Sequence, residues 1–380
     1  NLFIQNTRMS SGGAIHCKNC SWKDQKSQYK NNVAGNQGGA VYGSSRAQMI
    51  FENVIFEGNY ATESGGAITM ANSSKLTIHG VIARFNGLYR ITQDVIDFNG
   101  DGKIDDTEKL LGEYWNTSRT GGFLNLELEA HAEVTGKYDQ DFNIIEKNFS
   151  ANGSVVYLYK AEYPTIFKEL IIRDNFSTMG TYHQDCASSG SFIATAGIFE
   201  LSRSEVTRAH STRGPTLFGM SGADLKLSNN YIHSINNSYH TNLLYWGIAE
   251  SNIVTSNNYF KNLHAFGGKN RVGKSNSGTT VSSTDDIYDY ISSVGTSPFW
   301  FENAKNTTLT GAHFHKVNSV RIANEDAVVD SADVITIKNM RVDVQIRDTV
   351  FQSYGFLPAI LAAVPRVGIK IQQSKFISNE

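Results

Sequence analysis

The sequence predicts an all-β fold, a parallel β-helix solenoid of about twelve coils with loop insertions. Three observations support this prediction. Two short motifs recur together about every 26 residues, the segments between them alternate apolar and polar residues as short strands do, and no segment has the spacing of an amphipathic helix. A fixed period of this length is typical of proteins that stack one structural unit on the next.

The first motif is a pair of glycines followed by Ala and then Ile or Val. It begins at Gly12, Gly38 and Gly65, with starts 26 and 27 residues apart. Worn copies begin at Gly121 and Gly153. Because glycine accepts a positive φ and a close backbone approach, we expect each pair to mark the corner before the next strand.

The second motif is an aromatic residue followed three positions later by Asn, and it starts nine residues before each glycine pair. We expect the aromatic anchor to face inward and stack on its counterpart, and the Asn amide to bond at the turn, to its own chain or to the Asn of the next coil. The early copies are Phe3 with Asn6, Tyr29 with Asn32, and Phe56 with Asn59. Later copies, aromatic or aliphatic, are Ile82, Ile145 with Asn148, Ile172 with Asn175, Val206, Tyr231, Tyr259 with Asn262, Phe314, Phe351, and Phe376 with Asn379.

Together these motifs resemble the repeats of polymorphic outer-membrane proteins and related surface adhesins, most closely over residues 3–86. The resemblance implies a right-handed parallel β-helix that is extracellular or exposed on a cell surface and serves in adhesion or as a stalk. The general preference for right-handed crossovers agrees with that handedness.

We expect one solenoid over residues 1–380, with inserts at 87–120, 178–189, 267–296 and 353–366. Both ends carry the anchor motif, at Phe3 and Phe376, with no capping segment. An uncovered strand edge favours further pairing. The sequence therefore predicts that the solenoid continues in a longer chain or stacks end to end with copies of itself into a fibre.

The first insert contains a twelve-residue calcium loop, residues 97–108. Each ligand position of such a loop holds an oxygen donor, and Gly102 stands at its sharp turn. The predicted ligands are Asp97, Asn99, Asp101, the carbonyl of Lys103, Asp105 and Glu108. The segment resembles the loops of EF-hand and dockerin modules. It predicts a structural Ca²⁺, so a chelator should lower the melting temperature.

The pair Cys17 and Cys20 is consistent with a local disulfide, half a zinc site or a redox pair. His183 and Cys186 lie about five coils further along, too far to complete a zinc site, and a thioredoxin-like context is absent. A disulfide or two packed thiols therefore remain. Acceptor sequences for N-glycosylation, which favour an extracellular location, begin at Asn19, Asn72, Asn116, Asn148, Asn152, Asn175, Asn236 and Asn306.

Charge and hydropathy exclude some functions. The net charge of −2 gives no basic surface for nucleic acid. No apolar run approaches the roughly 20 residues of a membrane span. The remaining partners are copies of the chain itself and glycans.

Catalysis by a β-helix would need acidic and basic side chains stacked at one coil's spacing. The candidates are Asp139 with Asp141, His183 with Asp185, and Arg366 with Lys370. None of these pairs repeats at that spacing, so the sequence predicts a non-catalytic, structural or adhesive protein without catalytic residues. The alternatives are a polysaccharide lyase or glycoside hydrolase, which a groove of stacked acids would favour, and a glycan-binding stalk, which aromatic shelves would favour.

Overall fold

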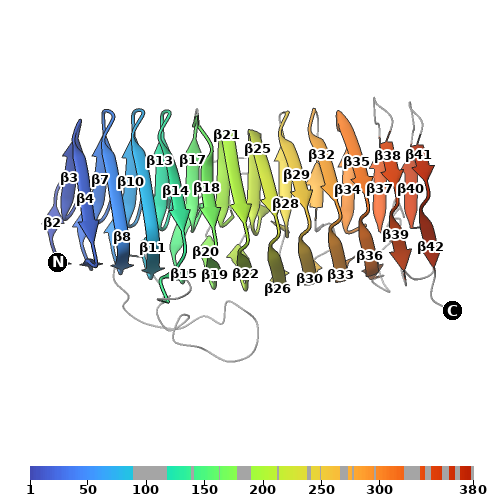
Figure 1. The fold of residues 1–380 in the computed structure, drawn as a ribbon, viewed down its shortest axis with the longest axis horizontal. Coiled ribbons are helices and arrows are strands. Elements are labelled where there is room, and N and C mark those ends of the chain that lie inside the picture. The colour runs from blue at the N-terminus through green and yellow to red at the C-terminus, as the bar shows by residue number, and fades with distance from the viewer. Residues whose placement is uncertain are drawn as a thin grey trace. The chain divides into compact units, whose positions relative to one another are not determined.

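The computed structural model describes residues 1–88, 118–137, 141–161, 163–177, 190–211, 214–237, 241–248, 250–265, 273–275, 278–294, 297–320, 334–338, 344–352, 359–363 and 369–377. These segments form strands and turns, without a helix among them. Nor do they include a helix long and apolar enough to cross a membrane. The paired strands run parallel, each beside the strand one repeat later, as in a β-solenoid (Figure 1).

The chain divides into two compact units. Unit 1 comprises residues 1–184 and 189–193, and unit 2 comprises residues 185–188 and 194–380. Each unit stacks successive repeats in the same way, so each is described by itself. One continuous solenoid over residues 1–380 stays a prediction.

Unit 1 contains three parallel sheets that take one strand from each repeat, and β8 and β11 bend through a corner to serve two of them. The anchor sheet contains β1 (Leu2–Ile4), β5 (Gln28–Lys30), the ends of β8 (Gln48–Glu57) and β11 (Lys75–Arg84), β15 (Asn143–Glu146) and β19 (Ile171–Arg173). The glycine sheet follows the glycine pairs and contains β3 (Ile15–Lys18), β7 (Val41–Ser44), β10 (Ile68–Ala71), β13 (Leu124–Glu127) and β17 (Val156–Tyr159). The middle sheet contains β4 (Ser21–Gln25), the starts of β8 and β11, β14 (His131–Thr135) and β18 (Thr165–Lys168). Short strands at the corners are β2 (Thr7–Arg8), β6 (Val33–Ala34), β9 (Tyr60–Ala61), β12 (Ser118–Thr120), β16 (Phe149–Asn152) and β20 (Phe176–Ser177).

Unit 2 repeats this plan. Its anchor sheet contains β22 (Glu205–Thr207), β26 (Tyr231–Asn237), β30 (Tyr259–Ala265), β33 (Ile287–Val294), β36 (His313–Val320), β39 (Val350–Gln352) and β42 (Lys375–Ile377). The other two sheets are built from β21 (Phe192–Ser202), β25 (Phe218–Ser228), β28 (Tyr245–Ile248), β29 (Asn252–Ser256), β31 (Gly273–Ser275), β32 (Thr280–Thr284), β34 (Phe299–Glu302), β35 (Asn306–Thr310), β37 (Ile335–Lys338), β38 (Val344–Arg347), β40 (Ile360–Ala363) and β41 (Ile369–Gln372). Short strands are β23 (His210–Ser211), β24 (Gly214–Pro215) and β27 (Thr241–Asn242).

The anchors stack inside each unit, as predicted. In unit 1 the ring of Tyr29 lies 4.7 Å from that of Phe3 and 4.9 Å from that of Phe56, centroid to centroid. In unit 2 five rings stack in register with neighbouring centroids 4.7–5.0 Å apart. They belong to Phe260, Tyr288, Phe314, Phe351 and Phe376. Burial of these aromatic columns is a large part of what holds successive repeats together.

Three predicted anchors are wrong by one residue. Ala83, Ile232 and Phe260 are fully buried, whereas their predicted neighbours Ile82, Tyr231 and Tyr259 lie on the outer surface of the sheet. Side chains alternate along a strand, so a slip of one residue moves the whole set to the other face. Consecutive apolar residues at these strands conceal the correct register in the sequence.

Three of the predicted inserts contain strands of the solenoid body. Strand β12 lies within 87–120, strands β31, β32 and β33 lie within 267–296, and β40 lies within 353–366. The prediction is therefore wrong for these strands, which pair in register with strands of neighbouring repeats. Tyr288, missed as an anchor, is one of their buried residues. The predicted insert 178–189 lies outside the described residues.

The glycine motif acts at the predicted corners. Gly38 has a φ of +62°, which disfavours any side chain. At Gly39 an added Cβ would lie 2.0 Å from the carbonyl oxygen of Gly66, so only glycine allows adjacent repeats to approach this closely. The worn copies at Gly121 and Gly153 also have positive φ values.

The Asn residues of unit 1 form the predicted ladder. The backbone N–H and side-chain amide of Asn32 both donate to Oδ1 of Asn59, at 3.1 and 2.9 Å. The same pattern connects successive members, which are Asn6, Asn32, Asn59, Asn86, Asn148 and Asn175. Every side-chain amide from Asn32 to Asn148 donates both to the next Asn and to a backbone carbonyl of the preceding repeat, and the amide of Asn175 donates only to backbone carbonyls, which fixes the spacing and register of the corner.

Unit 2 fills the same inward position, three residues after each anchor, with aliphatic side chains. These are Ala209, Ile235, Leu263, Ile291 and Val317, all buried. Its amide ladder lies instead two residues before the anchors and joins Asn230, Asn258 and Asp286. Asn262, predicted as a ladder residue, has a φ of +51° at a bend between paired positions.

Candidate functional site

The outer surface of the anchor sheet in unit 2 is the strongest candidate for a functional site. Residues on either side of each buried anchor point outward, because side chains alternate along a strand. Parallel pairing then places equivalent residues of successive repeats in rows. We define the tyrosine–histidine face as Tyr231, His233, Tyr259, Lys261, Ile287, Asp289, His313 and His315.

Aromatic rings begin this face at β26 and β30. The ring of Tyr231 stacks on that of His233 on the same strand, with centroids 4.1 Å apart, and on that of Tyr259 in the next repeat, at 5.5 Å. Tyr231 remains 38% exposed. Nε2 of His233 is 3.0 Å from the Glu205 carboxylate, which orients the imidazole. The stack thus leaves Tyr231 partly accessible to solvent.

Asp289 is at the centre of the face and connects three strands. The Tyr259 hydroxyl donates to its Oδ2 at 3.0 Å, and Nδ1 of His315 lies 2.7 Å from its Oδ1. Asp289 is only 9% exposed. Burial, together with the bond to Asp289, raises the pKa of the Tyr259 phenol, which therefore stays protonated and remains a donor.

The carboxylate also fixes the orientation of His315. Since a carboxylate oxygen can only accept, Nδ1 of His315 carries the hydrogen, and Nε2 is left with a free lone pair when the ring is neutral. Nε2 makes no hydrogen bond to any described residue, and the side chain is 29% exposed. Asp289 therefore holds one imidazole nitrogen ready to act as a base or a ligand.

The far side of the face carries His313 and a tyrosine–lysine pair. His313 Nε2 is 3.4 Å from Oε1 of Gln352, and its ring centroid is 6.3 Å from that of His315. Tyr290, at the adjacent corner, is 42% exposed and accepts a 2.7 Å hydrogen bond from Lys316. The Lys316 ammonium also lies 4.4 Å from the centroid of that ring.

Two buried carboxylates, those of Asp24 and Asp286, belong to the core. Asp24 accepts hydrogen bonds from Ser27 and Tyr29. Burial favours a raised pKa for Asp24, but its hydrogen bonds outweigh burial and hold the pKa below the ordinary value. Asp286 accepts bonds from Asn258 and Ser283, yet burial dominates and raises its pKa. Both satisfy polar groups that the solenoid buries, and neither faces solvent.

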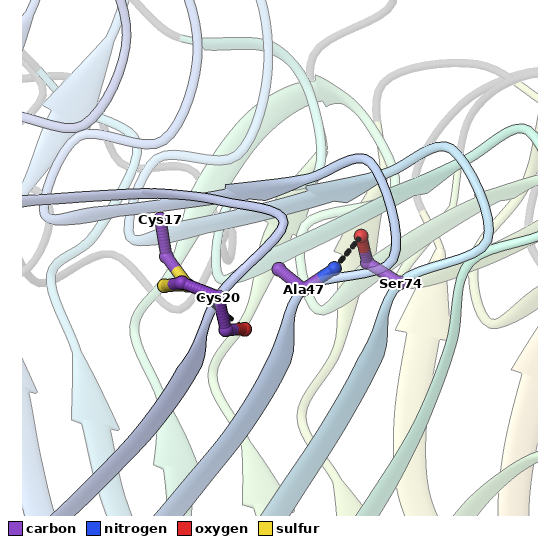
Figure 2. The surroundings of a disulfide bond; sticks show 4 residues. All are labelled: Cys17, Cys20, Ala47 and Ser74. Atoms are coloured by element: carbon purple, nitrogen blue, oxygen red, sulfur yellow. Dashed lines mark hydrogen bonds between the residues drawn. A yellow bond between two sulfur atoms is a disulfide. The ribbon is translucent and has the colours of Figure 1, made fainter.

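The disulfide candidate lies at a corner of unit 1. Cys17 and Cys20 are joined by a disulfide between β3 and β4, with Cα atoms 5.6 Å apart (Figure 2). At the same corner two repeats later, Ser74 Oγ donates to Ala71 O and accepts a bond from the N–H of Ala47, as Figure 2 shows in part. The disulfide thus stabilises the same turn that the Ser74 hydroxyl group stabilises by a hydrogen bond two repeats later.

Two predicted glycosylation sites are wrong. Asn148 and Asn175 are buried in the ladder, and their amide nitrogens, where a sugar would attach, donate to neighbouring repeats. Asn19, Asn72 and Asn306 are exposed, and Asn152 is half-buried. Asn116 and the side chain of Asn236 lie outside the described residues, so glycosylation there stays a prediction.

Other predicted sites fall outside the described residues. The whole calcium loop, Asp97, Asn99, Asp101, Lys103, Asp105 and Glu108, belongs to this group. So do Asp139, His183, Asp185, Cys186 and Arg366. Asp141 and Lys370 are exposed, but the residues with which they were paired are not described.

The tyrosine–histidine face was missed in the sequence. The sequence pattern places Tyr231 and Tyr259 in the core and does not distinguish His313 or His315. The available signal was polar or aromatic residues at alternate positions around each anchor, such as His313-Phe314-His315.

The comparisons with known proteins support the repeat assignment. Residues 53–69 match the family model of the Chlamydia polymorphic membrane protein repeat. The matched segment contains the anchor Phe56, the ladder residue Asn59 and the glycine pair at Gly65. No curated protein and no solved structure matches the chain. The predicted repeat type is confirmed: the chain carries a repeat of the polymorphic membrane protein kind.

Proposed function

We propose that this protein is a surface-exposed, non-catalytic adhesin of the outer membrane or cell surface that binds glycans through the tyrosine–histidine face of unit 2. The match to a polymorphic membrane protein repeat supports the location. The observation that carries the binding function is the row of outward-facing tyrosine and histidine side chains on successive strands, of which Tyr231 is exposed and the others are half-buried. Rigid strands hold these side chains in fixed positions, which lowers the entropic cost of binding.

A polyhydroxylated polymer suits this face better than a large apolar partner. Hydroxyl groups, imidazoles, a lysine and a carboxylate recur across neighbouring strands, about 4.8 Å apart, so an extended sugar chain could be met repeatedly along the row. Exposed apolar contact is limited to the tyrosines and Ile287, which is 43% exposed. Protein partners ordinarily need a larger continuous patch with a buried centre.

The test is calorimetric titration of the purified chain with a panel of neutral, uronate-containing and sulfated polysaccharides. The Tyr231→Ala variant should bind the preferred glycan about tenfold more weakly, or about 1.4 kcal/mol. Gln28→Ala, at the equivalent outer row of unit 1, is the matched control and should bind normally.

Two results would contradict the proposal. One is equal glycan affinity for wild type and Tyr231→Ala, which would place binding elsewhere. The other is release of shortened sugars during the titration, which would favour the polysaccharide-cleaving alternative over adhesion.

The finer structural features stay predictions. They are the right-handed coil, the count of about twelve, calcium binding at residues 97–108, and continuation or end-to-end stacking of the solenoid. Calcium would add rigidity to a surface stalk, and stacking would lengthen it. Neither is needed for glycan binding by unit 2.

A further inference from the structure

Two histidines on the tyrosine–histidine face are arranged as a chelating pair. His313 and His315 are alternate residues of β36, so both side chains leave the same side of the strand. Their register partners on β33 are Ile287 and Asp289. Imidazole suits zinc, copper and nickel, whereas calcium and magnesium prefer oxygen ligands.

The distance between the rings is compatible with one shared ion. A metal bound at about 2.0–2.1 Å from a ring nitrogen lies about 3.2 Å from the ring centroid, so two rings on one ion have centroids at most about 6.4 Å apart. The observed separation is 6.3 Å. At a tetrahedral angle the two centroids would lie about 5.2 Å apart, and small side-chain rotations at a solvent-facing position can supply the difference.

Asp289 supplies the second feature of a metal site. Histidine ligands typically donate their other ring N–H to a carboxylate, which fixes the tautomer and raises the basicity of the ligating nitrogen. Asp289 makes this bond to Nδ1 of His315 at 2.7 Å and is itself held by the Tyr259 hydroxyl. The free Nε2 of His315 is the nitrogen that such a metal would use.

We propose that His313 and His315 bind one divalent transition-metal ion, with Asp289 as the positioning residue. Within the segments that the structure describes, no three His, Cys, Asp or Glu side chains converge on one point. Among the described residues two ligands are therefore available, and water or an oxygen atom of an external ligand would complete the coordination. This inference does not depend on glycan binding.

The experiment uses the full chain without an affinity tag. Zn²⁺ is titrated calorimetrically, and Cu²⁺ is used as a paramagnetic probe in electron paramagnetic resonance. We expect one saturable Zn²⁺ site that needs both histidines, and a copper spectrum with hyperfine splitting from two imidazole nitrogens. His313→Ala and His315→Ala should each abolish the two-nitrogen pattern and weaken Zn²⁺ binding at least tenfold.

Controls separate a metal site from a change in folding. His233→Ala removes another histidine of the same face and should leave Zn²⁺ affinity unchanged. Asp289→Asn retains the shape but weakens the orienting bond, so it should lower affinity about 10- to 100-fold while the two-nitrogen copper pattern persists. Thermal melting of each variant checks the fold.

Unchanged Zn²⁺ affinity in the His313→Ala/His315→Ala double variant would overturn the proposal, even if zinc binds elsewhere on the chain. So would a wild-type copper spectrum without coupling to two nitrogens. A wild-type chain that binds the preferred glycan but not Zn²⁺ would show that the metal proposal fails, and a wild-type chain that binds Zn²⁺ but no glycan would show that the proposed function fails.

Discussion

The outer surface of the anchor sheet has different chemistry in the two units. In unit 1 one outer row alternates in charge, with ion pairs in which nitrogen and oxygen atoms lie 2.7–3.5 Å apart. Its members are Lys30, Glu57, Arg84, Glu146 and Arg173. The other row consists largely of half-buried isoleucines. In unit 2 the same rows carry tyrosines, histidines and Asp289. The comparison teaches that one repeated backbone can carry a surface of paired charges in one unit and a surface of aromatic rings and imidazoles in the other.

The two units also differ in the residues that fill their inner corners. Unit 1 places its amide ladder after the anchors, whereas unit 2 packs aliphatic side chains there and moves its ladder to the preceding corner. That second ladder ends at Asp286. The next repeat has Ala312 at this position, which offers no side-chain acceptor, so an acceptor-only carboxylate is a suitable last member.

The largest effect is expected from Asn59→Ala in the ladder of unit 1. The variant removes the acceptor of two Asn32 donors and the donor to Asn86, all buried. We expect a loss of about 3–5 kcal/mol in unit 1, since each unsatisfied buried group costs about 1–3 kcal/mol. Native-state hydrogen exchange with mass spectrometry measures the opening free energy of peptides from β5 and β8.

The matched change in unit 2 is Leu263→Asn, which creates the unit 1 residue type without ladder neighbours. It should also destabilise, because its amide would lie between Ile235 and Ile291. A stable Leu263→Asn variant, or unaltered exchange in Asn59→Ala, would show that the two corners do not differ as described.

A smaller effect on stability is expected from the two buried carboxylates. The pH dependence of their contributions should have opposite signs. The folded pKa of Asp286 is raised by burial, so its stabilising contribution is complete below its unfolded pKa and is lost as pH rises through the folded pKa. The folded pKa of Asp24 is lowered, so its contribution is present above its unfolded pKa and is lost as pH falls through the folded pKa.

Melting temperatures measured across the acidic to neutral range check these signs. The wild-type chain should lose the contribution of Asp286 as the pH rises from acid to neutral, and the Asp286→Asn variant should not show this loss. The wild-type chain should lose the contribution of Asp24 on acidification, and the Asp24→Asn variant should not show that loss. Identical pH profiles for the two variants would be inconsistent with their different surroundings.

The smallest effect is expected from the charged row of unit 1. Glu57 pairs with Lys30 and Arg84 on a partly exposed surface, where such pairs contribute less than about 1 kcal/mol. Glu57→Ala should therefore change the melting temperature little and should leave glycan and Zn²⁺ binding unaltered. A large loss of either binding activity would mean that unit 1 also takes part in recognition.

Where both motifs are intact, the sequence alone is sufficient to predict the packing of the inner face. The stacked rings of Phe3, Tyr29 and Phe56 and the amides beside them were predicted because aromatic stacking and amide ladders require identical residues at one spacing. The glycine corners were predictable for the same reason, since few residues accept a positive φ or so close an approach.

The outer surface of unit 2 could not be predicted, because the repeat period alone does not determine which residues of a strand point inward. At Tyr259-Phe260 two aromatic residues are adjacent, and either fits an inward anchor until the neighbouring strands are known. Asp289 and His315 are 26 residues apart and form a pair only once β33 and β36 are in register. A site built across repeats therefore depends on the register that the worn motifs no longer specify.

The central claim, that ligand recognition belongs to the outer anchor sheet of unit 2, is tested most directly by hydroxyl-radical footprinting with and without the preferred glycan. The account predicts protection of Tyr231, Tyr259, His313 and His315, with unchanged labelling of Ile55, Ile82 and Ile171 in the equivalent row of unit 1. Protection confined to unit 1, or absent from both rows although the glycan is bound, would contradict it.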